Sequence, residues 1–383
     1  MPGTIQDRAT AIDGLLFEVC ETLQLSPSQH SKAVSRYLAI SDVLNSSASP
    51  FSFIESNVYS QGSMRLGTTV KPINGPHDLD FVCELAISHV HADPIDLLDK
   101  LLGFFKDHGV YSEMVTRKNR CIRITYTDEF YLDLLPACRD HEIGGGCVQV
   151  PDRYSDGWKP SNPLGYAKWF EQSTKQVIVT KFAESYRAIA LDKALSIEPI
   201  PDLEATCDKR VLQLVVQLMK RWRDIHYVDS SFPPISIVLT TLAADCYRGE
   251  EMLSEALLAV LERIVARLDA ARVANRRIQV LNPVHNDEDF SERWDNNLKA
   301  YQDFEIGIRR FAAAWRFICM GSGNIDSQLE DLFGGVINTV VLKRAKRLQE
   351  SRENSRLGIL ASGIITSSAT SVAPMRRNTN DGE

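Results

Sequence analysis

Short apolar runs in the first half of the chain have the composition and period of β-strands. Residues 77–85 (HDLDFVCEL), 121–126 (CIRITY) and 130–135 (FYLDLL) are each rich in aliphatic and aromatic residues. In the first run, Leu79 and the apolar residues two and four positions later would face a core. Residues 93–108 lie between the runs and are expected to form a helix. This order of elements predicts a mixed sheet covered by helices.

Helical patterns dominate the rest of the chain. Residues 5–25 and 28–44 are expected to be helical, and a Ser-Pro-Ser stretch opens the second helix as a cap. In 211–222, the apolar residues form one stripe that leaves Lys220 free to face a cleft. Further amphipathic helices are expected at 250–272 and 291–319.

Chain length and the positions of Gly- and Pro-rich stretches divide the chain into parts. Because 383 residues exceed one typical core, two subdomains are expected. Residues 136–165 are rich in Gly, Pro and Asp, which predicts a long loop with a strand fragment at 147–151 that either lines a site or only connects. The fold class is therefore α+β with two lobes. Its expected parts are N-terminal helices (1–50), a mixed α/β core (51–165), a helical C-terminal lobe (166–356) and a flexible Ser/Thr-rich tail (357–383).

Composition narrows the setting. Hydrophobic residues make up 44% of the chain and charged residues 24%, values that are ordinary for a soluble globular protein. No apolar run reaches the roughly 18 residues of a membrane span, and the first residues lack the basic and apolar regions of a signal peptide. The eight cysteines are scattered without a CxxC pair, as expected for reduced thiols. These features predict a cytoplasmic protein without a membrane partner.

One group of residues raises the alternative of a zinc site. Cys138, His141 and Cys147 are close in sequence, but no fourth ligand is evident and the spacing matches no structural zinc pattern. The pattern favours buried thiols over a metal site, and the sequence leaves the choice open.

Three aspartates carry the candidate chemistry. Asp78 and Asp80 stand two apart in a predicted strand, so both carboxylates emerge on one face, about 6.6 Å apart along the chain. Asp133 lies inside an apolar strand, which is costly unless a cation or a hydrogen bond compensates the charge. Taken singly, an Asp-x-Asp pair on a solvated strand edge, or an Asp that caps a loop, would be the simpler interpretation.

A glycine-serine turn favours a metal site over these simpler interpretations of the aspartates. Gly62 and Ser63 precede Asp78 by about fifteen residues, and such a turn can hold a triphosphate. Three carboxylates are suited to hold two Mg²⁺ ions, for which Mn²⁺ can substitute. Together these features predict a nucleotidyltransferase.

The same residues carry a family resemblance. The series Gln61-Gly62-Ser63, Gly67-Thr68, Asp78-x-Asp80 and Asp133 resembles the DNA polymerase β-like nucleotidyltransferase superfamily. Within it, the chain is most similar to the bacterial cGAS/DncV-like nucleotidyltransferases, which make cyclic oligonucleotide signals in anti-phage defence. The helical half adds similarity at 218–222 (LMKRW), 234–239 (PISIVL), 281–283 (LNP) and 288–290 (EDF). The resemblance covers roughly residues 10 to 320.

The resemblance implies a bilobed polymerase β-like core and a role for each site residue. Asp78, Asp80 and Asp133 would be the catalytic residues and the ligands of two Mg²⁺ ions. The nucleotide would be bound by Gln61, Gly62, Ser63, Lys220 and Ser236. N-terminal helices would brace both lobes, and the helical lobe would complete the nucleotide cleft.

The resemblance also implies the reaction and the partners. The substrates would be NTPs, ATP among them, and the product a cyclic di- or trinucleotide with at least one adenine, made with release of pyrophosphate. A regulatory protein would activate the enzyme, and a downstream effector would read the product. The number and identity of the bases and the 3′–5′ or 2′–5′ linkage stay open.

Charge agrees with small nucleotide substrates. The chain carries a net charge of −7, whereas a protein that binds long nucleic acid usually has a basic face. Its basic residues gather beside the predicted strands, Arg123 among them, and on the helix that holds Lys220. No long template is therefore expected.

Two alternatives share most of these features. One is a transferase that acts on an RNA 3′ end or a protein acceptor, and the other is an inactive nucleotide-binding scaffold. The intact set of three carboxylates argues against the scaffold.

Overall fold

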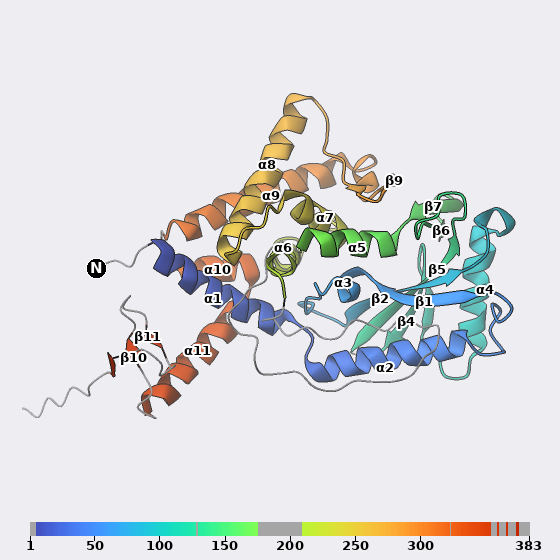
Figure 1. Cartoon of the computed structure of the whole chain (residues 1–383), viewed down its shortest axis with the longest axis horizontal. Coiled ribbons are helices and arrows are strands. Elements are labelled where there is room, and N and C mark those ends of the chain that lie inside the picture. The colour runs from blue at the N-terminus through green and yellow to red at the C-terminus, as the bar shows by residue number, and fades with distance from the viewer. Residues whose placement is uncertain are drawn as a thin grey trace, which may run out of the picture.

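The computed structural model describes residues 5–127, 129–174, 209–321 and 323–353, together with three short strands near the C-terminus. It has a lobe built on a mixed sheet and a lobe built of helices (Figure 1). This confirms the predicted α+β class and the helical C-terminal lobe.

The sheet has the order β1-β2-β5-β4-β3, and β2 and β5 are its parallel pair. The remaining pairs are antiparallel. The strands predicted at 77–85, 121–126 and 130–135 are confirmed as β2, β4 and β5. The strand bounds are β1 (Ser56–Gln61), β2 (His77–Leu85), β3 (Val115–Arg117), β4 (Ile122–Tyr126), β5 (Phe130–Arg139), β6 (Val148–Asp152) and β7 (Gly157–Ser161).

Helices α2 (Pro27–Leu44) and α4 (Pro94–Asp107) pack against apolar side chains of the sheet. Tyr37 of α2 stacks on Phe81 of β2 with ring centroids 4.7 Å apart, and its hydroxyl donates to the Val58 carbonyl (2.7 Å). Ser26 caps α2 in a capping box, as the Ser-Pro-Ser stretch predicts. The aspartate side chains of β2 and β5 point away from these helices and toward the cleft described below.

The prediction of one long loop over 136–165 is wrong. Strand β5 continues to Arg139, and β6 and β7 form an antiparallel hairpin that extends the sheet. The expected strand fragment at 147–151 corresponds to β6. Three glycines lie in the tight turn at 140–147, whereas the prolines lie within the strands and at the start of α5.

The helical lobe surrounds α6, whose residues from Val211 to Trp222 are all buried. The helix expected at 291–319 begins at Leu298, because Asn297 caps it and a short 3₁₀ turn, η3 (Glu292–Trp294), precedes it. The helix bounds are α5 (Pro163–Thr174), α6 (Val211–His226), α7 (Ser236–Cys246), α8 (Leu253–Val273), α9 (Leu298–Cys319), α10 (Ile325–Phe333) and α11 (Val336–Glu353).

The first helix, α1 (Ile5–Leu23), belongs to the core of the helical lobe, whereas α2 belongs to that of the sheet lobe. The Asp13 carboxylate accepts from the backbone N–H groups of Leu253 and Ser254 (both 2.8 Å) and so caps the start of α8. Glu18 pairs with Arg344 of α11 (2.9 Å). The two N-terminal helices thus tie into different lobes.

The expected flexible tail at 357–383 lies mostly outside the described residues. Within it, β10 (Gly358–Ile359) pairs with β11 (Ile365–Thr366) and β12 (Ala373–Pro374). Among the helices that the structure describes, none is long and apolar enough to cross a membrane.

Candidate active site

A cleft of about 1420 Å³ lies between the sheet lobe and the helical lobe. Its walls come from the turn after β1, from β2 and β5, from α6 and α7, and from residues 290–300. Seven of the eight predicted site residues line it: Gly62, Ser63, Asp78, Asp80, Asp133, Lys220 and Ser236. The eighth, Gln61, is the last residue of β1 and adjoins the cleft-lining Gly62.

Strand register brings four polar residues into one row. Gln61 of β1 is paired with Asp80 of β2, Asp80 with Asp133 of β5, and Asp133 with Arg123 of β4. Because neighbouring strands lie about 4.8 Å apart, the two carboxylates are direct neighbours. Asp78 stands two residues before Asp80 and projects to the same face, as the two-residue spacing predicts. We call Asp78, Asp80 and Asp133 the acidic cluster.

Gly62 allows the chain to turn tightly above the acidic cluster. Its φ of +61° lies in the left-handed region, and a Cβ atom there would come within 2.6 Å of Asp80 Oδ2. Two residues of the following turn are joined by a hydrogen bond from the Thr68 N–H to the Ser63 carbonyl (2.9 Å). A glycine is therefore required at this place by both backbone conformation and space.

The three carboxylates of the acidic cluster lie close enough for their negative charges to repel one another. Burial beneath the cleft, together with the neighbouring carboxylates of Asp133 and Asp78, raises the pKa of Asp80 to about 7. Asp78 is more open, with 62% of its side chain exposed, against 18% for Asp133. The cluster thus needs a positive partner at neutral pH.

Arg123 is that partner. Its Nε donates to Asp133 Oδ1 (2.6 Å), and its Nη2 donates to Asp133 Oδ2 (2.7 Å) and to Asp78 Oδ1 (3.2 Å). The hydrogen bond to Asp133 raises the pKa of Arg123 above its ordinary value. The sequence places Arg123 near the catalytic strands, but its pairing with Asp133 depends on the β4–β5 register.

The acidic cluster fits divalent metal ions by its donor chemistry. Three carboxylates supply the hard oxygen ligands that Mg²⁺ and Mn²⁺ prefer, and the guanidinium of Arg123 shows that a cation is stabilised there. As they stand, however, no three carboxylate, imidazole or thiol groups among the described residues are arranged to hold an ion. Arg123 occupies the space between two of the expected ligands.

Lys220 lies in the cleft wall. Its position off the apolar stripe predicts a free side chain, but in the structure the side chain is buried and hydrogen-bonded. Its ammonium donates to the Thr68 hydroxyl (2.9 Å) and carbonyl (3.2 Å), and only 5% of the residue is exposed. Burial, and next the charge of Arg223, lower its pKa to about 7. Lys220 thus reaches the turn after Ser63 from beneath.

Two glutamines missed by the sequence analysis share this role. Gln217 Nε2 donates to the Thr69 carbonyl (2.8 Å), and Gln213 Nε2 donates to the Leu66 carbonyl (3.1 Å). With Lys220, they form one row along α6 at positions i, i+4 and i+7. Their helical spacing was visible in the sequence, but their partners, about 150 residues away, were not.

Ser236 is the first residue of α7, and its hydroxyl accepts from Arg223 of α6. Arg223 also pairs with Asp224 (2.8 Å). Ser236 therefore reaches the cleft as part of a polar group with Arg223, a residue that also lines the cleft.

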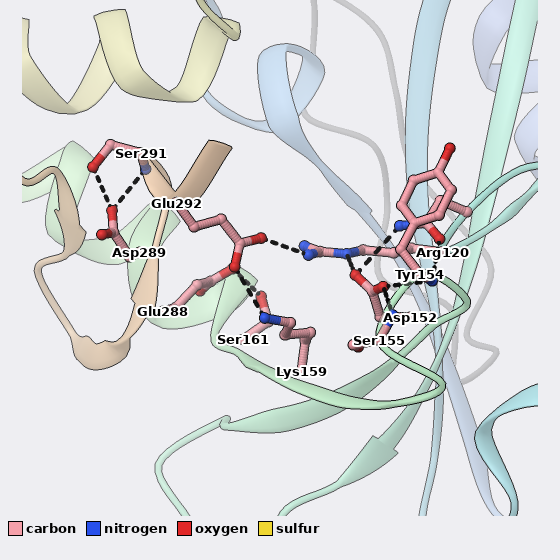
Figure 2. A network of polar contacts seen from close by, with 11 residues as sticks. Arg120, Asp152, Tyr154, Ser155, Lys159, Ser161, Glu288, Asp289, Ser291 and Glu292 are labelled. Carbon is pink, nitrogen blue, oxygen red and sulfur yellow. Dashed lines mark hydrogen bonds and ion pairs between the residues drawn. The ribbon is translucent and has the colours of Figure 1, made fainter. Parts of the chain in front are cut away.

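A charged network joins the two lobes beside the cleft (Figure 2). Arg120 pairs with Asp152 of β6 (2.6 Å) and with Glu292 of η3 (2.9 Å), and Lys159 of β7 also pairs with Glu292 (3.0 Å). Ser161 of β7 donates to a carboxylate oxygen of Glu288 (2.9 Å), which lies in β9 (His285–Asp289). We call these contacts the interlobe bridge. None of the described residues lining the cleft lies in 136–165, so the β6–β7 hairpin connects lobes instead of forming the cleft wall.

The possible zinc ligands are not gathered into a site. Cys138 and Cys147 are buried free thiols, and Cys147 Sγ accepts from the Asn162 side chain (3.3 Å). Within the described part of the chain, Cys138, His141 and Cys147 do not form a metal-binding group. The interpretation as core thiols is the one that the structure favours.

Comparisons with known proteins identify chains of similar sequence and fold. Residues 14–173 match the family of second messenger oligonucleotide or dinucleotide synthetase domains. The chain is 28% identical to a c-di-GMP synthase from Roseivirga ehrenbergii, with 98% of both chains covered. It is 29% identical to the cyclic dinucleotide synthase CdnG from Bradyrhizobium diazoefficiens, over 98% of this chain and 95% of that protein.

Solved structures show the same fold. The structure of B. diazoefficiens CdnG in complex with GTP superposes with a TM-score of 0.72 at 24% identity, over 86% of this chain and 97% of that one. The structure of the E. coli MS115-1 CdnC:HORMA-deltaN complex gives 0.57 at 12% identity, over 82% and 94%. The motifs, the fold and these relatives agree: the chain is similar to the bacterial cGAS/DncV-like nucleotidyltransferases.

Proposed function

We propose that this protein joins two NTPs into a cyclic dinucleotide without a template, using divalent metal ions held by the acidic cluster. The observation that carries the proposal is the meeting of Gly62-Ser63, the acidic cluster and Lys220 in one cleft of about 1420 Å³. A cleft of this size is large enough for nucleotide substrates. The relatives that cover almost the whole chain are named as cyclic dinucleotide synthases.

The proposed chemistry assigns a task to each side of the cleft. Gly62 and Ser63 bind the donor β- and γ-phosphates through backbone N–H groups and the hydroxyl. The Asp133 carboxylate orients the attacking ribose hydroxyl and accepts its proton. An O–P bond forms at the α-phosphate, the bond to the β-phosphate breaks, and pyrophosphate leaves. A second transfer closes the ring.

Metal ions and the helical lobe complete the site. Mg²⁺ or Mn²⁺ bound by Asp78, Asp80 and Asp133 would neutralise charge on the phosphoryl oxygens and favour the nucleophilic hydroxyl. Lys220 fixes the turn after Ser63 and adds positive charge beneath the phosphates. Ser236 and Arg223 contact phosphate from α7 and α6, and Gln61 supports the turn from β1.

The names of the relatives support GTP as a substrate of this protein. One is named a c-di-GMP synthase, and a structure of the other contains GTP. We therefore infer that at least one base of the product is guanine. The adenine expected from the family resemblance stays a prediction for the second base, and a product with both bases satisfies both statements.

The biological setting is part of the proposal. We infer that the product is a second messenger in anti-phage defence, made in the cytoplasm and read by an effector protein. The structural neighbour CdnC is in complex with a HORMA protein, which supports the idea of a regulatory partner. We place the catalytic core at 51–165 and the helical lobe that closes the cleft at 166–356.

The test is incubation of the purified chain with each NTP alone and in pairs, with Mg²⁺ or Mn²⁺ and no template. We expect release of pyrophosphate and a phosphatase-resistant cyclic dinucleotide identified by mass spectrometry. The Asp78→Asn, Asp80→Asn double variant should make none. Label that appears only on added RNA or protein would instead support the transferase alternative.

A further inference from the structure

Arg123 makes the contacts that a metal ion would make in the acidic cluster. Its guanidinium bonds to both oxygens of Asp133, at 2.6 and 2.7 Å, and reaches Asp78 at 3.2 Å. Only 22% of its side chain is exposed. The planar fork matches a carboxylate bidentately, which a lysine cannot do.

We propose that Arg123 is a built-in counter-ion that competes with the divalent metal for Asp133 and must leave Asp133 before the catalytic metal is bound. This inference rests on the proposed function, because it requires the acidic cluster to be the metal site. It makes Arg123 a positioning residue that sets when the site accepts metal.

Space and charge both require the exchange. Mg²⁺ binds oxygen at about 2.0–2.1 Å in near-ideal octahedral geometry, so its ligands cannot also hold a guanidinium in between. Both Asp133 oxygens are already engaged by Arg123. A second cation in the same place would add repulsion between two positive charges.

A neighbouring ring contacts Arg123 in addition to the carboxylates. The guanidinium carbon lies 4.5 Å from the centroid of the Tyr131 ring, on β5 two residues before Asp133. Cation–π attraction to Tyr131 persists after the bonds to Asp133 are broken. Arg123 can therefore move aside and remain at the cleft, where its charge favours a metal that arrives with a triphosphate over a free ion.

The test measures Mn²⁺ binding to the full chain without nucleotide, by electron paramagnetic resonance of the free ion. We expect Arg123→Gln to tighten Mn²⁺ binding on the order of tenfold, since it removes a charge-assisted bidentate pair. Arg123→Lys keeps the charge but loses the fork, and should give a smaller increase. With the wild-type chain, the Arg123 Nε–H resonance should shift when Mg²⁺ and a non-hydrolysable GTP analogue are added together.

Lys118→Gln is the matched control, because Lys118 is a nearby charge with no contact to the acidic cluster among those described. It reports the long-range effect of one lost charge. The inference is overturned if neither Arg123 variant binds Mn²⁺ more tightly than wild type, or if Lys118→Gln tightens binding equally.

Asp80→Asn separates this inference from the proposed function. If Asp80→Asn abolishes Mn²⁺ binding while the Arg123 variants match wild type, the acidic cluster is the metal site and only the role of Arg123 fails. If Asp80→Asn leaves Mn²⁺ binding unchanged in every background, the proposed metal site itself fails. Circular dichroism of each variant verifies that it is folded.

Discussion

Asp80 bears the largest electrostatic penalty of the acidic cluster. It is deeply placed, it faces two like charges, and its pKa lies near 7 instead of near 4. The unfolded chain releases this proton at about pH 3.8, so between roughly pH 4 and 7 the native state binds more protons. The contribution of Asp80 to stability therefore falls as the pH rises through this window.

Asp80→Asn should relieve that penalty. In EDTA at pH 8, we expect the variant to be more stable than wild type by about 2 to 4 kcal/mol in the free energy of unfolding. The difference should shrink steadily below pH 7 and vanish below about pH 3, because the wild-type carboxyl is then protonated in both states. Denaturant unfolding at several pH values measures it.

Asp107→Asn serves as the control, because Asp107 lies at the end of α4, away from the acidic cluster. A loss of stability in Asp80→Asn at pH 8 would contradict the interpretation of Asp80 as a strained charge. The activity of Asp80→Asn should be lost at every pH.

At the scale of elements, α6 holds the turn that follows Ser63. Lys220, Gln217 and Gln213 bond to residues 66–69 from one face of the helix. The helix is buried along this length, so its own position is fixed by packing. The turn that carries Ser63 is thus held by the opposite lobe.

Lys220→Met should separate charge from packing in this row of α6 residues. We expect kcat/KM for NTPs to fall, by an amount that corresponds to a loss of about 1 to 3 kcal/mol in transition-state stabilisation. This is the value of a hydrogen bond to a charged group. Gln217→Met is the matched variant: it also loses a bond to the turn but no charge, so its loss should be smaller. Equal effects of the two variants would show that Lys220 only positions the turn.

The pH dependence gives a second measurement on the same residue. Since the pKa of Lys220 is lowered to about 7 in the free protein, raising the pH through 7 discharges it. NTP affinity of the wild type should weaken over this range, and Lys220→Met should lack that step.

Elements were predictable from sequence where a single period dominated. Strand β2 has such a period and is confirmed, and the period of α6 correctly predicts a helix, although its polar face is buried as well. Of the β6–β7 hairpin, only the strand fragment at 147–151 was predicted, because the turn residues of the hairpin outnumber its apolar ones. The Arg123–Asp133 pair could not be predicted, because a one-residue slip between β4 and β5 would place Arg123 on the other face.

At the scale of the whole molecule, the interlobe bridge connects the sheet lobe to the helical lobe beside the cleft. Glu292 receives both Arg120 and Lys159 from the sheet lobe, and it adjoins the cleft-lining residues of η3. These side chains are about 36 to 40% exposed, so each pair adds only ~0.2–1 kcal/mol to stability. Their effect on lobe position should exceed their effect on stability.

Glu292→Gln should loosen the lobes without unfolding them. We expect a loss of less than about 1 kcal/mol in stability, but faster amide hydrogen exchange in β7 and in residues 290–297. High salt should weaken the bridge in wild type and leave the variant little changed. Glu262→Gln is the control, since Glu262 pairs with Arg316 inside the helical lobe (2.8 Å). Unchanged exchange in Glu292→Gln would show that packing alone sets the lobes.

The placement of α1 has a consequence for how the protein is made. Its apolar face completes the core of the helical lobe, and Glu18 meets Arg344, 326 residues later in the chain. At a synthesis rate of 5–20 residues per second, α1 waits roughly 15 to 65 s on the ribosome before that partner emerges. The sheet lobe can form meanwhile, but the cleft stays incomplete until residues 290–300 of its wall have been made. Nucleotide binding in the complete cleft must therefore wait until most of the chain has been synthesised.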